Sequence, residues 1–150
     1  EVYGMTGGQV SPTTAENRLT TTTPSGNSEP AFDACKLAEA AGAGLVGREV
    51  TMQTPALRNL IKAGLEFDGF SFLEVMSDCT EIYGRKNDLG ESAEMIMAQK
   101  SDMRPQAYTT ITDQPFRPNR LVTGVLAQSD RPEYGATYRR QAAALRGETA

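Results

Sequence analysis

Apolar side chains recur at helical spacing in two segments of the chain. The first segment has one narrow face of small residues, and the second has a broader face of leucine and isoleucine. The residues concerned are Ala34, Leu37, Ala38 and Ala41, followed by Leu57, Leu60, Ile61 and Leu65. Thr54 and Pro55 offer a hydroxyl N-cap and a proline at the first helical position, and Gly69 closes the second segment. The spacing predicts helices over residues 32–43 and from residue 54 to Gly69.

Extended segments flank the second helix, at residues 45–50 (LVGREV) and 70–76 (FSFLEVM). A strand, a helix and a strand within roughly thirty residues form a βαβ unit, which implies a parallel sheet with a right-handed crossover. Further on we predict a helix over 91–100 with Ala93, Ile96 and Met97 inward, a strand over 121–127 and a polar helix over 134–146. The expected fold is an α/β protein with a doubly wound, mainly parallel sheet.

A glycine-rich turn follows the first residues of the chain. Glu1 to Tyr3 form a short β-like run, interpreted as the end of a strand, and Gly4 to Gln9 then supply hydroxyl, amide and bare backbone groups. Glycine takes positive φ and lets a ligand approach the main chain, and successive exposed N–H groups form a concavity that binds anions. The pattern alone fits both a phosphate site and an ordinary turn.

Residues 11–30 form a polar segment rich in Thr, Ser, Pro and Gly. Composition alone favours a flexible linker or a disordered segment. Structureless loops longer than about 12–15 residues are nevertheless uncommon in compact domains unless they are functional. The residues by themselves leave these two interpretations open.

Composition narrows the class of protein. The chain has 150 residues, 39% apolar and 23% charged, with a net charge of −4, which suits a globular domain with its own core and argues against a nucleic-acid surface. No stretch approaches the length of a membrane-spanning helix. The chain contains no histidine, so it cannot build a Ser-His-Asp triad, a Cys-His pair or a histidine-based zinc site alone. Its two cysteines, Cys35 and Cys79, are expected to stay free.

Several motifs, taken in order, resemble one enzyme family. They are YGMTGGQVSPTT (3–14), TTTTPSGN (20–27), EPAFD (29–33), AAGAGLVGR (40–48), GFSFLEVMSDCTEIYGRKN (69–87) and VTGVLAQSDRPEY (122–134). Together they cover most of the chain and resemble the β subunit of the 2-oxoacid:ferredoxin oxidoreductases, in particular the two-subunit 2-oxoglutarate type. The combination is specific, although no single motif is.

The resemblance implies oxidative decarboxylation of a 2-oxo acid with thiamine diphosphate held through Mg²⁺. Val2 resembles the residue whose backbone carbonyl binds Mg²⁺, and Tyr3, Gly4, Met5 and Thr6 resemble residues around the cofactor. Residues 11–30 resemble the active-site loop that folds over cofactor and substrate. The family's GDG motif and side-chain Mg²⁺ ligands would lie upstream of Glu1. We therefore expect the chain to be a C-terminal portion that binds the cofactor poorly alone.

Cys79 follows the 70–76 segment in polar surroundings. By itself it fits a plain thiol, because one cysteine cannot build a cluster. The resemblance implies that it is the fourth ligand of a [4Fe-4S] cluster whose other three cysteines lie upstream. Electrons would pass to ferredoxin and the acyl group to CoA, in a cytoplasmic enzyme. The family's α subunit supplies the glutamate that activates the cofactor, and no catalytic residue is assigned in this chain. Cys35, beside the first helix face, is interpreted as a buried inert thiol.

Other candidates keep two interpretations each. For Arg85, Lys86 and Asn87, one interpretation is contact with a CoA phosphate or a partner protein, and the other is a solvated loop. Arg48 closes toward the active site or forms an ion pair. The prolines and arginines of residues 104–120 form a subunit-wrapping arm or a surface loop; they are Pro105, Pro115, Pro118, Arg104, Arg117 and Arg120.

The resemblance divides the chain into two segments and leaves two alternative functions open. Residues 1–103 are assigned to the thiamine diphosphate domain, and residues 104–150 to an arm, a last strand and a helix. The alternatives are a relative specific for pyruvate or another 2-oxo acid, and a non-catalytic scaffold fragment. A GDG motif and three cysteines in the upstream sequence would argue against the scaffold.

Overall fold

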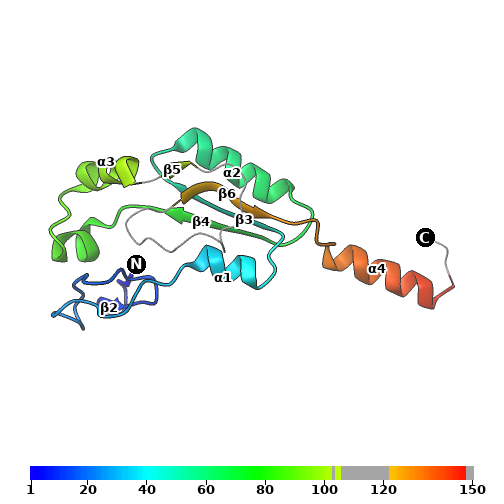
Figure 1. Ribbon diagram of the computed structural model, residues 1–150, viewed down its shortest axis with the longest axis horizontal. Coiled ribbons are helices and arrows are strands. Elements are labelled where there is room, and N and C mark those ends of the chain that lie inside the picture. The colour runs from blue at the N-terminus through cyan, green and yellow to red at the C-terminus, as the bar shows by residue number, and fades with distance from the viewer. Residues whose placement is uncertain (103, 106–121, 148–150) are drawn as a thin grey trace.

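The computed structural model describes residues 1–102, 104–105 and 122–147 (Figure 1). In chain order the elements are β1 (Val2–Tyr3), β2 (Gln9–Val10), α1 (Ala34–Ala40), β3 (Leu45–Val50), α2 (Thr54–Glu66), β4 (Ser71–Met76), the π-helical turn η1 (Thr80–Gly84), α3 (Ser92–Asp102), β5 (Arg104–Pro105), β6 (Val122–Gln128) and α4 (Tyr134–Leu145). Most of the expected proline-rich arm, and Leu121 of the last strand, lie outside the described residues.

The main sheet has the strand order β4-β3-β6-β5. β3 and β4 pair in parallel, from Leu45 opposite Ser71 to Val50 opposite Met76, which confirms the predicted βαβ unit. β6 runs antiparallel to β3, and β5 pairs with β6 in parallel. The sheet is therefore mixed, and the orientation of its last long strand departs from the expected parallel pattern.

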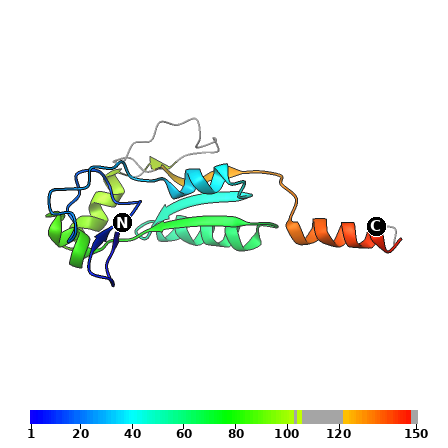
Figure 2. The ribbon, with the colours of Figure 1, turned by 90° about the horizontal axis from the view of Figure 1, so that it is seen from below.

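Helices cover both faces of this sheet, as a doubly wound fold requires (Figure 2). Every residue of β3 is buried, because the strand has a neighbour on each side and a helix on each face. Val46 packs with Cys35 of α1 and with Leu126 of β6. On the other face, a Cβ added to Gly47 would come within 2.5 Å of Leu60 Cδ1, so glycine lets α2 approach the strand closely.

A bulge interrupts the pairing of β3 with β6. Val46 lies opposite Ala127 and Gly47 lies opposite Val125, with a register shift between them, so Leu126 is the extra residue on β6. Its side chain is buried in the cluster that also contains Cys35 and Ala43. The bulge therefore directs an additional apolar side chain into the core.

The phase of α1 differs from the prediction. Leu37 is 55% exposed, while Cys35 is completely buried, so the predicted burial of Cys35 is confirmed and the predicted inward position of Leu37 is wrong. The cause is the N-cap residue Asp33, whose Oδ1 accepts hydrogen bonds from the amides of Cys35 (3.0 Å) and Lys36 (3.2 Å). Because Asp33 is also bound to the sheet through Arg48, the helix is rotated to turn Cys35 inward.

The other helices show smaller departures from the pattern. α2 begins at Thr54 itself, with Pro55 in the next position and no side-chain cap, so Thr54 is not the N-cap. Leu60 is buried, whereas Leu65 is 82% exposed. Among residues 92–100 of α3, Met95, Ile96 and Gln99 are half-buried, and the predicted inward residues Ala93 and Met97 are exposed.

The described elements form an elongated molecule with different structures at its two ends. The β1–β2 hairpin, the polar loop, η1 and α3 gather at one end, and α4 extends away from the sheet at the other (Figures 1 and 2). Glu133 caps α4 by accepting from the amides of Gly135 and Ala136, and these hydrogen bonds lower the pKa of its carboxyl. The division at residues 103 and 104 stays a prediction, although β6 shares a sheet with β3.

Candidate functional site

The N-terminal segment is a small hairpin set apart from the main sheet. Val2 pairs with Val10 and Tyr3 with Gln9 in antiparallel register, so the first residues do not extend a main-sheet strand as interpreted from the sequence. Gly7 and Gly8 have φ of 113° and 86°, the positive values expected for this turn. Their amides, however, donate to Gly4 O (3.1 Å) and Tyr3 O (2.8 Å). An anion concavity built on these two amides is therefore wrong for this conformation.

The tip of the hairpin presents three of the five residues assigned to the cofactor, whereas Val2 and Tyr3 form β1. Gly4, Met5 and Thr6 are exposed, and the Thr6 hydroxyl donates to Gln9 Oε1 at 2.6 Å while Gln9 Nε2 donates to Thr6 O at 2.8 Å. These two bonds fix the tip without burying it. Exposed main chain in a fixed turn can meet a ligand, so the tip is the part of the hairpin that suits this role.

Residues 12–32 form a folded loop, which excludes the disordered-linker interpretation. Asn27 holds the loop together. Its Nδ2 donates to Thr14 O and to Glu29 O, each at 2.9 Å. Its main-chain carbonyl accepts from the amide of Asn17, and its own amide donates to Arg18 O. The amide of Phe32 donates to Pro12 O at 2.7 Å and closes the base. Buried polar groups that are satisfied in this way specify one loop conformation.

The loop is also attached to the start of the chain. The buried Thr14 hydroxyl donates to the carbonyl of Glu1, and Ser11 Oγ donates to the same oxygen at 2.9 Å. Further along, the amide of Thr21 donates to Gly8 O at 2.9 Å. The hairpin and the loop therefore form one unit.

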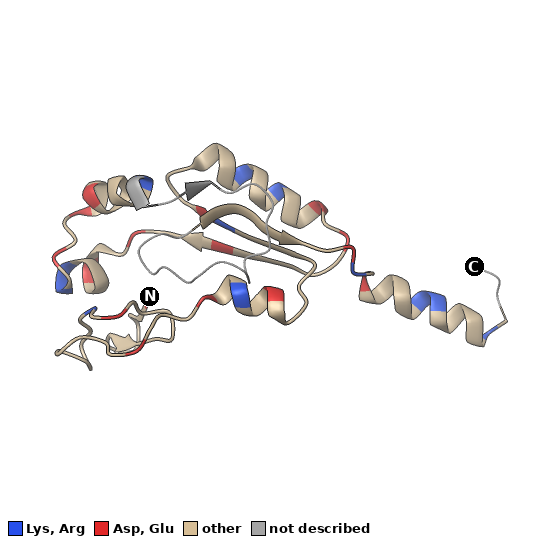
Figure 3. Ribbon diagram, in the orientation of Figure 1, with Lys and Arg blue, Asp and Glu red and all other residues tan. Residues whose placement is uncertain are grey.

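A buried ionic cluster binds Asp33, the residue that follows this loop and caps α1, to the sheet. Arg48 on β3 binds Asp33 (Nη2 to Oδ1, 2.7 Å) and Glu74 on β4, with only 4% of its side chain exposed. Figure 3 shows the basic segment of β3 beside the acidic segment of β4. The ion-pair interpretation of Arg48 is confirmed. The thiol of Cys35 also contacts Glu74, and burial raises its pKa although the charge of Arg48 opposes the shift.

Cys79 lies directly beyond β4, is exposed, and precedes η1. Its carbonyl accepts from the amide of Gly84 at 2.7 Å, the five-residue spacing of a π turn. Only glycine fits at position 84, because the Cβ of any other residue would lie 2.9 Å from that carbonyl oxygen and 2.8 Å from Met95 Sδ. The turn therefore places one accessible thiol at the carboxyl end of β4.

η1 packs against the hairpin. A Cβ on Gly4 would lie 3.6 Å from Ile82 Cδ1, and one on Gly8 would lie 3.3 Å from Ile82 Cγ2. Tyr83 is buried, and burial followed by the nearby Glu1 carboxylate raises the pKa of its phenol. The turn that begins after Cys79 thus packs close to Gly4 and Gly8 of the hairpin.

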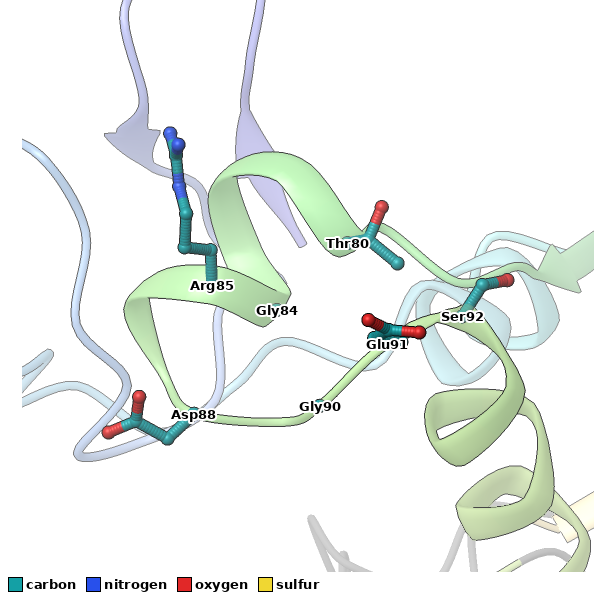
Figure 4. A pocket seen from close by; sticks show the side chains of 7 residues that line it. All are labelled: Thr80, Gly84, Arg85, Asp88, Gly90, Glu91 and Ser92. Carbon is teal, nitrogen blue, oxygen red and sulfur yellow. The ribbon is translucent and has the colours of Figure 1, made fainter.

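A hollow of about 520 Å³ opens between η1 and the start of α3 (Figure 4). Its lining includes Thr80, Gly84, Arg85, Asp88, Glu91 and Ser92. Arg85 is paired with Glu81 (Nη2 to Oε1, 3.0 Å), and the Ser92 hydroxyl donates to Asp78 at 2.5 Å. Of the predicted basic group, Arg85 lines this hollow and Lys86 is exposed. Asn87 instead bonds to Leu19 and Tyr83.

The described residues hold no complete metal site. Among residues 1–102, 104–105 and 122–147, no three His, Cys, Asp or Glu side chains gather in a position to bind one ion. Within those same ranges no helix is long and apolar enough to cross a membrane. Val2 and Cys79 stay predicted ligands, of Mg²⁺ and of an iron–sulfur cluster respectively.

Comparison with known proteins identifies the class to which this fold and site belong. Residues 1–75 match the family described as thiamine pyrophosphate enzyme, C-terminal TPP binding domain. The match covers half of the chain, and the chain belongs to this family.

Individual relatives sharpen the assignment. The 2-oxoglutarate synthase subunit KorB of Methanothermobacter marburgensis is 39% identical over 132 residues, which is 88% of this chain and 46% of the relative. The subunit of the same name from Methanocaldococcus jannaschii is 38% identical over 133 residues, 89% of this chain and 49% of the relative. The predicted resemblance to the β subunit of the 2-oxoglutarate type is confirmed, and the chain spans about half the length of these curated relatives.

A solved structure supports the fold. The 2-oxoglutarate:ferredoxin oxidoreductase from Magnetococcus marinus, solved with 2-oxoglutarate, coenzyme A and succinyl-CoA bound, superimposes with a TM-score of 0.76 at 20% sequence identity. The match covers 99% of this chain and 51% of that chain. At this identity the comparison establishes the α/β architecture.

Sequence reasoning missed the asparagines that hold the site together. Asn27 was part of a motif and Asn87 part of a group assigned to a phosphate or a solvated loop, but neither was predicted to bond across the site. The only signal was asparagine in a loop, a residue type that readily bonds to nearby main chain. Partners far apart in the sequence leave no periodic pattern.

Proposed function

We propose that this chain is the C-terminal portion of the β subunit of a 2-oxoacid:ferredoxin oxidoreductase acting on 2-oxoglutarate. The overall reaction converts 2-oxoglutarate and CoA to succinyl-CoA and carbon dioxide, and its two electrons leave singly to ferredoxin. The family match and the names of the relatives support the class of reaction. The observation that carries the proposal is the packing of η1, headed by the exposed Cys79, against the hairpin that bears the cofactor residues.

The hairpin suits one side of a thiamine diphosphate site. We assign Val2, Tyr3, Gly4, Met5 and Thr6 to this site, with the Val2 carbonyl as a Mg²⁺ ligand. Main-chain oxygen is a ligand type that Mg²⁺ accepts alongside carboxylate, phosphate and water oxygens. When bound, thiamine diphosphate supplies the stabilised carbanion that the reaction needs, while the protein supplies position and electrostatics. The folded loop of residues 12–32 holds the hairpin in place through Glu1 and Gly8.

Cys79 suits one ligand position of a [4Fe-4S] cluster. Its thiol is accessible, whereas Cys35 is buried in the core of the sheet. Iron–sulfur clusters bind through cysteine thiolates, and each such site needs several. The proposal therefore assigns the other three ligands to cysteines outside this chain.

The proposal includes the remaining partners of the family. These are an α subunit that supplies the glutamate activating the cofactor, ferredoxin as electron acceptor, CoA and the 2-oxo acid, in a cytoplasmic enzyme. Residues 1–103 belong, on this proposal, to the cofactor domain, and residues 104–150 add the arm, β6 and α4.

The experiment is an assay of the full-length protein with its α subunit. With thiamine diphosphate, Mg²⁺ and CoA present, reduction of ferredoxin should depend on 2-oxoglutarate and proceed more slowly with pyruvate. Equal or faster reduction with pyruvate would make the enzyme a relative with another 2-oxo acid as substrate. No reduction with any 2-oxo acid, in a protein that is folded and holds its subunits, would favour a non-catalytic scaffold.

A further inference from the structure

Asn87 joins two segments that are 68 residues apart in the sequence. Its Oδ1 accepts from the amide of Leu19 at 2.8 Å, and its Nδ2 donates to the carbonyl of the same residue at 3.0 Å. Nδ2 also donates to Tyr83 O at 2.8 Å. One side-chain amide therefore holds both main-chain groups of Leu19 and one carbonyl of η1.

This set of contacts requires an amide. A primary amide carries an acceptor oxygen and two N–H donors, and the three contacts use the oxygen and both N–H groups. Aspartate would keep the acceptor, lose both donors, and place a negative charge against two carbonyl oxygens. Alanine would remove all three contacts without adding charge. Both substitutions therefore remove the two bonds donated by Nδ2, and only alanine also removes the bond accepted by Oδ1.

Leu19 lies in the part of the loop that touches the hairpin. Two residues later the amide of Thr21 donates to Gly8 O at 2.9 Å. One residue earlier the Arg18 guanidinium carbon lies 5.8 Å from the centre of the Tyr83 ring. Residues 18–21 are therefore in contact with the hairpin on one side and η1 on the other.

η1 leads back to Cys79 through a single turn. The amide of Gly84 donates to Cys79 O at 2.7 Å, and the amide of Asn87 donates to Gly84 O at 3.2 Å. Hydrogen bonds thus connect Cys79 through η1 and Asn87 to Leu19. The main chain from Leu19 to Thr21 and the bond from the Thr21 amide then continue this path to Gly8 of the hairpin. Packed and hydrogen-bonded elements of this kind can transmit a displacement from one end to the other.

We propose that Asn87 is a positioning residue that fixes the cofactor hairpin relative to Cys79. It does so by holding residues 18–21 of the loop on η1. The two ligands at the ends of this path, thiamine diphosphate and the cluster, rest on the proposed function. The connection between the hairpin and the Cys79 turn is a property of the chain itself and can be tested without either ligand.

Hydrogen exchange on the full-length protein without added cofactor tests the connection first. In Asn87→Asp and Asn87→Ala, the amides of Leu19, Thr21 and Gly84 should exchange about tenfold faster or more, because the loop opens locally. The amides of β3 should keep their wild-type rates. The matched control is Asn59→Asp on the exposed surface of α2, which should change none of these rates. Faster exchange confined to Leu19, or no change, would overturn the proposal.

Cofactor measurements then test its consequence. Titration with thiamine diphosphate and Mg²⁺ should show an affinity lower by about tenfold in both Asn87 variants, the cost of one or two lost hydrogen bonds. The reduced cluster should show an altered electron paramagnetic resonance spectrum, and Asn59→Asp should match wild type in both. Normal affinity and spectrum in variants with faster loop exchange would overturn the positioning role. A wild-type protein with neither ligand would refute the proposed function, while the exchange experiment would still decide on Asn87.

Discussion

The sheet and the polar end of the molecule are stabilised in different ways. The sheet, with α1 and α2 on its faces, buries the whole of β3 among apolar side chains such as Val46, Leu60 and Leu126. The polar end, defined as residues 1–32 and 79–91, buries Thr14, Thr20 and Asn27 instead and depends on bonds from side chains to main chain. Apolar burial tolerates small displacements, whereas hydrogen bonds require specific atoms at specific distances.

This difference has a consequence for function. A region held by a few polar contacts opens more easily than a region held by a core, and ligand-binding loops are drawn from the less stable parts of proteins. The residues assigned to the cofactor and Cys79 all lie in the polar end. We therefore expect substitutions in the two regions to be separable: global unfolding in one case, local loss of the site in the other.

The largest effect should come from Arg48, which binds the first residue after the polar loop to the sheet. Arg48→Ala leaves Asp33 and Glu74 without their buried cation, which should lower the free energy of unfolding by about 4 kcal/mol, as for other broken buried ion pairs. Urea unfolding of the full-length protein measures it. The control is Lys62→Ala, whose pair with Glu66 is exposed and spans 3.7 Å, and which should cost less than about 0.5 kcal/mol. A cost for Arg48→Ala as small as for Lys62→Ala would show that the buried ion pairs of Arg48 do not stabilise the fold.

The next largest effect should arise within the sheet. Leu126→Ala creates a cavity beside Cys35 and Val46 and should lower the free energy of unfolding by about 3 kcal/mol. The exposed Leu145 at the end of α4 provides a matched leucine; its replacement by alanine should change stability by less than about 0.5 kcal/mol. Equal effects at the two positions would mean that the bulge of β6 does not contribute to the core.

The sequence predicted the sheet better than the polar end for a physical reason. Residues 45–50, 54–66 and 71–76 carry a periodic apolar pattern, and that pattern reports burial directly. The antiparallel direction of β6 could not be predicted, because a strand has the same pattern in both directions. Leu37 was misplaced because Asp33, through its bond to Arg48, sets the rotation of α1.

In the polar end, the candidate site residues were predicted from sequence motifs and not from apolar periodicity. The assigned residues Val2 to Thr6 and Cys79 came from motifs, and their roles stay predictions. The bonds of Asn87 to Leu19 and of Thr14 to Glu1 join distant parts of the loop regions. No spacing rule could connect them, since each depends on a conformation that only the folded chain shows. The π turn at η1 was likewise not predicted.

Alkaline pH should weaken the sheet through Cys35. Burial raises the pKa of this thiol in the folded protein, whereas in the unfolded chain the thiol pKa is about 8.5. The stability that the neutral thiol contributes is therefore complete below about pH 8.5 and is lost as the pH rises above that value. Between pH 8 and pH 10, wild type should therefore lose about 2 kcal/mol more than Cys35→Ala, since each pH unit above the unfolded pKa costs about 1.4 kcal/mol. Urea unfolding at the two pH values measures this difference. Parallel pH profiles for the two proteins would show that the thiol ionises without cost.

The smallest effect should distinguish the two glycines of the hairpin turn. Both have positive φ, so alanine at either position should cost about 1 kcal/mol locally. At Gly8 the new Cβ would also overlap the Thr21 hydroxyl, whereas at Gly7 the nearest atom is 3.8 Å away. Gly8→Ala should therefore reduce turnover and speed exchange at the Thr21 amide more than Gly7→Ala. The opposite order would show that contact with Thr21 does not shape the turn.

The central claim is that the polar end holds one ligand of an iron–sulfur cluster at Cys79. In the full-length protein, Cys79→Ser should keep the circular dichroism of wild type, because the residue is exposed and lies beyond β4. Serine oxygen is a harder ligand than thiolate, so iron content and charge-transfer absorbance should fall, and electron transfer to ferredoxin should fall more than 2-oxo acid binding. Cys35→Ala, which removes the other thiol of this chain, should keep its iron. Iron, absorbance and turnover equal to wild type in Cys79→Ser would contradict the account.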